Sequence, residues 1–220
     1  MKFTISREAF LKPLVLVAGV VERRQTLPVL ANILVVVEGD QLTLTGTDLE
    51  VELVGRVSLD QAGEDGGVTI PARKLMDICK SLPDHAMIEV MQNEEHVLVR
   101  SARSKFKLST LPATDFPNVE DSPESFEFEV PQMALKQLVD QTGFAMAQQD
   151  VRYYLNGMLF EIKDSQLRTV ATDGHRLATS FMPVGLPDQA AQQLIVPRKG
   201  VLELARLMTE EDSTVRLVIG

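Results

Sequence analysis

The sequence predicts an α+β fold in which one unit, an antiparallel sheet with two helices, occurs twice. Three observations support this prediction. Short segments recur in the same order about 125 residues apart, alternating strand-like runs are separated by hairpin turns, and each half carries two helical patterns.

The repeat is degenerate but consistent in its spacing. In chain order, the matched segments are Phe3–Ser6 with Phe128–Pro131, Leu30–Val37 with Tyr154–Glu161, Leu42–Asp48 with Leu167–Asp173, and Thr69–Lys74 with Ile195–Gly200. The offsets lie between 124 and 126, and the second match sets Asn32 opposite Asn156. Several matches in one order indicate an internal duplication.

The duplication sets the expected domains. The first unit spans 1–117, and the stretch 118–127, with its acids, serines and proline, is expected to be a linker. The second unit spans 128–220 and is expected to be incomplete at its C-terminus, because its last match, Val215–Val218, leaves no counterpart for His96–Leu111. We expect either that a partner covers the open sheet edge or that the chain is a fragment.

Local patterns predict the elements of both units. Strands are expected at Lys2–Ile5, Asn32–Glu38, Gln41–Thr45, Glu50–Leu59, Met87–Gln92, Val97–Ser101, Lys105–Ser109, Gly157–Ile162, Gln166–Thr172 and Leu177–Phe181. Helices are expected at 6–24, 71–82, 131–144 and 197–208. Ser6 and Pro71 are typical helix starts, whereas Pro13 predicts a kink or an irregular turn. Cys79 falls on an apolar helix face and is expected to be a buried small hydrophobe.

The charge of the chain is unevenly distributed. There are 22 basic and 31 acidic residues, a formal net charge of −9, which by itself argues against a nucleic-acid partner. The four expected helical segments nevertheless hold 11 basic and 5 acidic residues, so they carry +6 and the remainder −15. Arg73, Lys74, Arg198 and Lys199 stand at helix starts, where the helix dipole disfavours cations. This placement favours a positive helical surface that faces a polyanion.

Composition limits the cellular location of the protein and the groups that it could bind. The single cysteine, Cys79, cannot form an internal disulfide, so a reducing, cytoplasmic location is expected. The N-terminus lacks a signal-peptide pattern, and the longest apolar stretch, Leu14–Val21, is too short to span a bilayer. No histidine or cysteine pair has metal-ligand spacing, and phosphate-binding motifs are missing, so neither a metal nor a cofactor is expected.

One stretch could support acid–base chemistry, because Asp173 and His175 stand two residues apart. The competing interpretation is a hairpin turn, since Asp-Gly between two alternating runs is a turn signal and Thr47–Glu50 occupies the same place in the first copy. We expect an architectural turn whose Gly-His-Arg sequence, special to the second copy, forms a binding rim.

Arg152–Leu155 holds both tyrosines of the chain beside an arginine, a composition typical of interface hot spots and base-stacking surfaces. The alternative is the start of a strand with one tyrosine buried. If the strands pair as in the first copy, this run and the 172–177 turn lie at one end of the same sheet. We then expect a shared pocket with Leu155 and Leu177 as its apolar floor.

Five segments carry a family resemblance: Thr45–Glu50, Ser109–Pro112, Asp150–Met158, Ala171–Leu177 and Ile195–Gly200. They resemble the bacterial replicative sliding clamps, the beta subunits of DNA polymerase III. The resemblance implies the DNA-clamp fold, with three units per chain and two chains closed head-to-tail into a homodimeric ring around duplex DNA. It implies helices inside, sheets outside, and no catalytic site. Such a clamp tethers the replicative polymerase alpha subunit, the clamp loader, other polymerases and repair proteins, which bind through short peptide motifs.

The resemblance also implies three groups of site residues. The DNA group is Arg24, Gln149, Tyr153 and Tyr154, to which the charge argument adds Arg73 and Arg198. The peptide group is Arg152, Tyr154, Leu155, Thr172, Gly174, His175, Arg176 and Leu177. The ring-interface group is Lys74, Ile78, Arg103, Phe106 and Leu108, the last two alternating with lysines on an expected edge strand.

The chain departs from this family in length, because the third unit, with the rest of the peptide pocket, is missing. We therefore expect that it cannot close a normal ring and that it binds peptides weakly. Two alternatives stay open. One is a stand-alone adaptor that binds peptides and is indifferent to DNA, and the other is an enzyme that uses Asp173 and His175.

Overall fold

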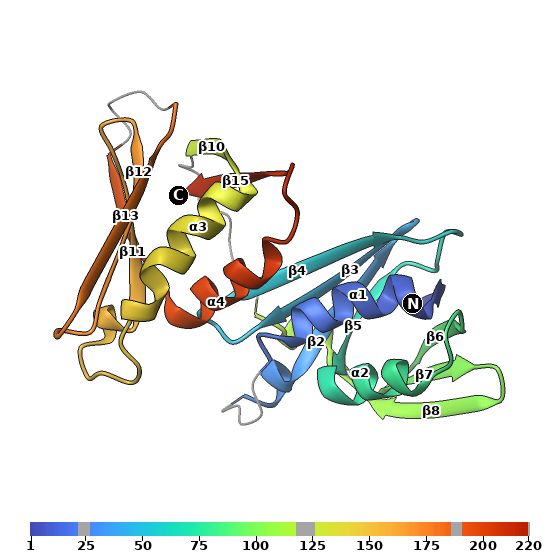
Figure 1. Cartoon of the computed structure of the whole chain (residues 1–220). Helices are drawn as coiled ribbons and strands as arrows, with labels where there is room; N and C mark the ends of the chain where they lie inside the picture. The colour runs from blue at the N-terminus through green and yellow to red at the C-terminus, as the bar shows by residue number, and fades with distance from the viewer. Residues whose placement is uncertain (22–26, 118–125, 186–190, 220) are drawn as a thin grey trace. The chain divides into compact units, whose positions relative to one another are not determined.

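The computed structural model describes residues 1–21, 27–117, 126–185 and 191–219. The chain forms two compact units, 1–119 and 120–220 (Figure 1). Each unit combines antiparallel sheet with two helices, which confirms the expected α+β class. No helix among the described residues is long and apolar enough to cross a membrane.

The first unit contains two sheets and two helices. One sheet, of order β1-β6-β7-β8, consists of β1 (Lys2–Ser6), β6 (Met87–Asn93), β7 (His96–Ser101) and β8 (Ser104–Ser109). The other, of order β4-β3-β2-β5-β9, consists of β2 (Asn32–Glu38), β3 (Gln41–Thr47), β4 (Glu52–Ser58), β5 (Gly66–Pro71) and β9 (Leu111–Pro112). The helices are α1 (Arg7–Ala18) and α2 (Ala72–Ser81), with 3-10 turns η1 (Pro28–Ala31) and η2 (Ala113–Asp115).

The second unit repeats this plan over fewer strands. A sheet of order β13-β12-β11-β14 consists of β11 (Gly157–Lys163), β12 (Gln166–Thr172), β13 (Leu177–Pro183) and β14 (Gln192–Pro197). β10 (Phe126–Pro131) pairs with β15 (Thr214–Ile219). The helices are α3 (Gln132–Thr142) and α4 (Arg198–Leu207), with 3-10 turns η3 (Gly143–Ala145) and η4 (Tyr153–Leu155). Both helices cover the same face of the four-stranded sheet (Figure 1).

The strand registers confirm the duplication and correct one detail of the alignment. Leu34 lies opposite Thr45 as Leu159 lies opposite Val170, and Asn32 lies opposite Pro71 as Gly157 lies opposite Pro197. The counterpart of Asn32 is therefore Gly157, and the expected match with Asn156 is wrong by one residue. Backbone pairing, which sets the face of every side chain, decides the register over residue similarity.

The first helix starts as expected but does not break at Pro13. The Ser6 hydroxyl accepts a hydrogen bond from the backbone N–H of Ala9 at 3.3 Å, which confirms its role as N-cap. α1 runs continuously through Pro13, so of the two expected alternatives, a kink or an irregular turn, the irregular turn is wrong. The proline ring is buried close to Gly55 of β4, where an added Cβ would lie 2.7 Å from the ring. A glycine opposite the proline thus makes room for it.

The helices of the structure are shorter than the sequence patterns indicate. α1 ends at Ala18 although its pattern predicts helix to residue 24, and residues 22–26 lie outside the described part of the chain. With the observed bounds the four helices hold nine basic and four acidic residues, a net charge of +5. The excess of positive charge on the helices therefore persists.

Sequence patterns missed the strands β5, β9, β10, β14 and β15. β5 begins with Gly66 and Gly67 and ends with a proline, residue types that are poor in strands. Its pairing with β2 overrides this preference. β10 begins at Phe126, two residues before the expected start of the second unit.

We predict that Gly46→Ala destabilises the first unit by about 1–3 kcal/mol, because an added methyl group overpacks this site. A Cβ on Gly46 would lie 2.4 Å from the backbone oxygen of Val17, which cannot move without displacing α1. Gly67→Ala in β5 is the control, since its Cβ would make only ordinary contacts at 3.5 Å. Urea denaturation of both variants tests this, and equal midpoints would contradict it.

We predict that the Cys79 thiol does not react with iodoacetamide in the folded chain and reacts fully once the chain is denatured. Its side chain is completely buried, and burial raises the pKa of the thiol to about 12, so little thiolate forms at pH 8. Mass spectrometry with and without urea measures the labelling. Rapid labelling without urea would contradict the buried position.

Candidate functional site

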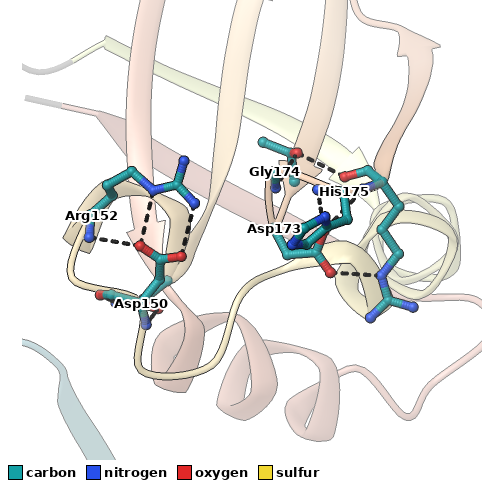
Figure 2. Close-up of polar contacts among 8 residues, drawn as sticks. Asp150, Arg152, Asp173, Gly174 and His175 are labelled. Atoms are coloured by element: carbon teal, nitrogen blue, oxygen red, sulfur yellow. Dashed lines mark hydrogen bonds and ion pairs between the residues drawn. The ribbon is translucent and has the colours of Figure 1, made fainter.

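The candidate site lies at one end of the four-stranded sheet of the second unit. β11 and β12 are antiparallel, with Leu159 opposite Val170, so the start of β11 and the end of β12 lie at the same end of the sheet. Arg152–Leu155 is separated from β11 by Asn156 alone, and the 173–176 turn joins β12 to β13. The expectation that these two segments lie at the same end of one sheet is confirmed. Figure 2 shows them side by side.

The turn after β12 is held by two side chains. The Thr172 hydroxyl donates to the carbonyl of Arg176 at 2.7 Å and accepts from the backbone N–H of Gly174 at 3.1 Å. The Asp173 carboxylate accepts the backbone N–H groups of His175 and Arg176, both at 3.0 Å (Figure 2). Local hydrogen bonds of this kind replace the hydrogen bonds between strands where the chain reverses.

The first unit contains the same turn, which confirms that it is architectural. Thr47 bonds to Val51 and Leu49, and the Asp48 carboxylate accepts the N–H groups of Glu50 and Val51. The residue after the aspartate has a positive φ in both copies, +79° at Leu49 and +87° at Gly174. Only glycine adopts this angle without strain, so the second copy has the relaxed form.

The geometry speaks against general-base catalysis by Asp173. The N–H groups of His175 and then Arg176 hold the pKa of its carboxyl down to about 2, with a further contribution from the Arg176 guanidinium. A carboxylate of so low a pKa is a poor proton acceptor near neutral pH. Asp173 shapes the turn and orients Arg176, whose Nε donates to it at 2.9 Å.

Asp150 plays the same part in the preceding segment. Its carboxylate accepts from the backbone N–H of Arg152 at 2.8 Å, from Nε at 3.0 Å and from Nη2 at 2.9 Å (Figure 2). The Arg152 side chain, followed by its backbone N–H, holds the pKa of Asp150 down to about 2. Both exposed arginines of the site are thus held by a nearby aspartate.

The apolar residues of the site divide into buried and exposed ones. Leu155, the last residue of η4, is 8% exposed, whereas Leu177 is 66% exposed on the edge strand β13. Tyr153 and Tyr154 are 84% and 50% exposed, with ring centroids 5.9 Å apart in an edge-to-face pair. The interpretation that one tyrosine is buried is therefore wrong, because η4 turns both rings to the surface.

A hollow of about 420 Å³ adjoins the turn. Its lining comes from the segment Met146–Asp150 and from Asp173, His175 and Arg176. It brings Gln149 of the DNA group together with His175 and Arg176 of the peptide group, which the sequence treated as separate. Sequence reasoning also missed Phe144, whose ring lies 5.5 Å from the Arg176 guanidinium carbon. Its only signal in the sequence is an aromatic residue just past a helix.

Two positive residues of the DNA group, Arg73 and Arg198, lie at helix starts, as expected. Arg73 is exposed in the first turn of α2. Arg198 is the first residue of α4, half-buried, with Nη1 3.5 Å from the carbonyl of Met146. Arg24 lies outside the described residues.

The ring-interface group gathers on α2 and around the edge strand β8. Lys74 and Arg103 are exposed, and Ile78 is half-buried. Phe106 and Leu108 share one face of β8, but that face turns toward the core, so Leu108 is only 6% exposed. β8 is an edge strand of its sheet, and the side chain of Leu108 is buried within the unit.

Within the described residues, no group of three or more histidine, cysteine, aspartate or glutamate side chains could hold a metal ion. The acidic groups of the site are instead engaged with arginines and backbone N–H groups.

Two family models match the chain. The model of the DNA polymerase III beta subunit N-terminal domain matches residues 1–120, and that of the central domain of the same subunit matches residues 129–220. The chain is 64% identical over 220 residues to the beta sliding clamp of Pseudomonas aeruginosa and 55% identical over 222 aligned residues to that of Escherichia coli K12. Each match covers the whole chain and 60% of the relative's length.

Solved structures agree with these matches. A sliding clamp (DNA polymerase III subunit beta) from P. aeruginosa, bound to griselimycin, superposes with a TM-score of 0.95 at 64% identity, over 100% of this chain and 60% of that one. The Caulobacter crescentus polymerase III beta subunit superposes with a TM-score of 0.91 at 40% identity, over 100% of this chain and 61% of its own. The two units, their repeated registers and the matched models lead to one conclusion: the chain belongs to the DNA polymerase III beta subunit family.

Proposed function

We propose that this chain is part of a non-catalytic sliding clamp. In the proposed mechanism the whole protein closes as a head-to-tail dimer around duplex DNA in the cytoplasm. It tethers the polymerase alpha subunit, the clamp loader, other polymerases and repair proteins for processive replication. Because the chain spans about 60% of the length of its relatives, these activities are proposed for the whole protein.

One observation carries this proposal: the entire chain superposes on a sliding clamp at a TM-score of 0.95 with 64% identity. At this similarity nearly two thirds of the residues, and not the fold alone, are shared. A shared fold by itself would leave function open, because one fold hosts many functions.

The charge distribution supports duplex DNA as the partner. The helices carry a net +5 within a chain of net charge −9, and Arg73 and Arg198 stand at helix starts. Scattered cations of this kind attract phosphates without reading bases. The proposed DNA group is Arg24, Arg73, Gln149, Tyr153, Tyr154 and Arg198.

The site at the edge of the second sheet supports peptide recognition. It combines exposed apolar side chains, two oriented arginines and an adjoining hollow, which together resemble a small interface hot spot. The proposed peptide group is Arg152, Tyr154, Leu155, Thr172, Gly174, His175, Arg176 and Leu177. The proposed ring-interface group is Lys74, Ile78, Arg103, Phe106 and Leu108.

We predict that Arg73→Ala and Arg198→Ala each weaken association of the chain with duplex DNA by about twofold to fivefold and lower the salt slope by about 1. Fluorescence anisotropy of a labelled duplex, at several salt concentrations, measures both effects. Arg168→Ala is the control, because this exposed arginine lies on a sheet strand and pairs with Glu161 at 3.4 Å. If Arg168→Ala has the same effect as the helix variants, the helical DNA surface is wrong.

We predict that His175→Ala and Leu177→Ala each weaken binding of griselimycin by about tenfold, since both remove contact surface at the site. Griselimycin is the probe because it is bound in the related P. aeruginosa structure. Leu202→Ala on α4 is the matched control, a leucine exposed to 52% outside the site. Isothermal titration calorimetry gives the affinities, and binding that survives both site variants would contradict this pocket as the griselimycin site.

A further inference from the structure

Asn156 belongs to none of the three proposed groups, yet its side chain fixes the backbone of the site. Its Oδ1 accepts a hydrogen bond from the backbone N–H of Asp150 at 2.9 Å, and its Nδ2 donates to the backbone carbonyl of Asp150 at 2.8 Å. Both polar atoms of the amide therefore bond to the same residue. This two-point contact closes the segment 150–156 into a defined loop.

Asp150, fixed in this way, holds Arg152. The carboxylate engages the backbone N–H, Nε and Nη2 of Arg152, a bidentate side-chain pair with one additional backbone bond (Figure 2). Such pairs fix the direction of the guanidinium as well as its distance. Residues 151–154 are exposed, so the order of Arg152 comes from these bonds and not from burial.

The guanidinium of Arg152 reaches the neighbouring turn. A Cβ added to Gly174 would lie 3.1 Å from Nη2 and 3.6 Å from Nη1 of Arg152, so the guanidinium lies against the bare glycine backbone. Glycine at position 174 therefore has a second use besides its positive φ. Any larger side chain would push Arg152 away from the turn.

Asn156 also contacts the first residue of α4. The backbone carbonyl of Asn156 accepts the N–H of Arg198, the first residue of that helix, at 2.9 Å. A continuous run of contacts thus leads from the start of α4 through Asn156, Asp150 and Arg152 to Gly174. It joins a residue of the proposed DNA group to the rim of the proposed peptide pocket.

The first unit shows that this arrangement is not a general feature of the fold. Asn32, which the sequence aligns with Asn156, is the first residue of β2, and its Nδ2 donates to the Thr69 hydroxyl at 2.8 Å. Asn156 precedes β11 by one residue and leaves the strand position to Gly157. The one-residue difference frees its side chain to bind Asp150.

We propose that Asn156 and Asp150 are positioning residues of the peptide pocket, which act by holding the Arg152 guanidinium against Gly174. This inference rests on the proposed peptide-binding function. A partner then meets an arginine that is already oriented, so less conformational entropy is lost when it binds. The low pKa of Asp150 agrees, because it reflects the same bonds from Arg152.

The test compares Asn156→Ala, Asn156→Asp and Asp150→Asn with the wild-type chain, with Asn32→Ala as the matched control in the first unit. Asn156→Asp keeps an oxygen for the Asp150 N–H but loses the donor to its carbonyl. Calorimetry with griselimycin gives the affinity, thermal unfolding gives the stability, and NMR follows the Arg152 Nε–H signal. NMR titration also follows the Asp150 carboxyl.

We expect Asn156→Ala to weaken griselimycin binding about tenfold, and Asn156→Asp somewhat less, with thermal stability nearly unchanged. The Arg152 Nε–H signal should move in both variants and in Asp150→Asn. The titration midpoint of Asp150, about 2 in the wild type, should rise toward its ordinary 3.8 in Asn156→Ala. Because this pKa is lowered on folding, the Asp150–Arg152 pair stabilises the folded chain above about pH 4 and is lost as the pH falls through about 2.

Unchanged affinity and an unmoved Arg152 signal in the Asn156 variants would overturn the inference. So would an affinity loss in Asn32→Ala as large as in Asn156→Ala, or a loss explained by an equal rise in the unfolded fraction. If the wild-type chain does not bind griselimycin, its part of the proposed pocket is insufficient for this ligand. The Arg152 signal and the Asp150 titration then still decide whether Asn156 positions Arg152.

Discussion

The antiparallel pairing of β11 with its two neighbours is the constraint on which the candidate site depends. Pairing with β12 brings the end of that strand to the start of β11. Pairing with β14 brings the start of α4 to the same end of the sheet. Three segments far apart in the chain therefore meet: the loop 150–156, the 173–176 turn and the first turn of α4. A shift of one residue in either pairing would turn their side chains to the opposite face.

At this end of the sheet, where the hydrogen bonds between strands stop, aspartate carboxylates accept the backbone N–H groups instead. Asp150 and Asp173 each accept backbone N–H groups and also hold an arginine two or three residues later. Because these bonds are local and charge-assisted, the loops keep a fixed shape while their side chains remain exposed. The same acidic residues therefore contribute to the negative charge of the chain and orient its positive groups.

The duplication provides an internal control for these arguments. Both units contain the turn held by threonine and aspartate, so the turn belongs to the fold. The differences mark what is special to the second unit: glycine replaces Leu49 at the strained position, and Arg176 occupies the place of Val51. The site was thus built by changing side chains on a conserved backbone plan.

The sequence by itself determined the α+β class, the duplication, most strand positions, the Ser6 cap and the burial of Cys79. These features follow from the regular spacing of apolar residues along the chain, which marks the buried faces of helices and strands. It also located Arg152–Leu155 and the 172–177 turn, because their composition departs from the surrounding strands. Only the tertiary structure decided the registers that make Gly157 the counterpart of Asn32, the continuity of α1 through Pro13, and the inward face of Leu108. It also decided the two bonds between Asn156 and Asp150, which depend on the path of the loop, and the close approach of Arg152 to Gly174, which joins two separate segments.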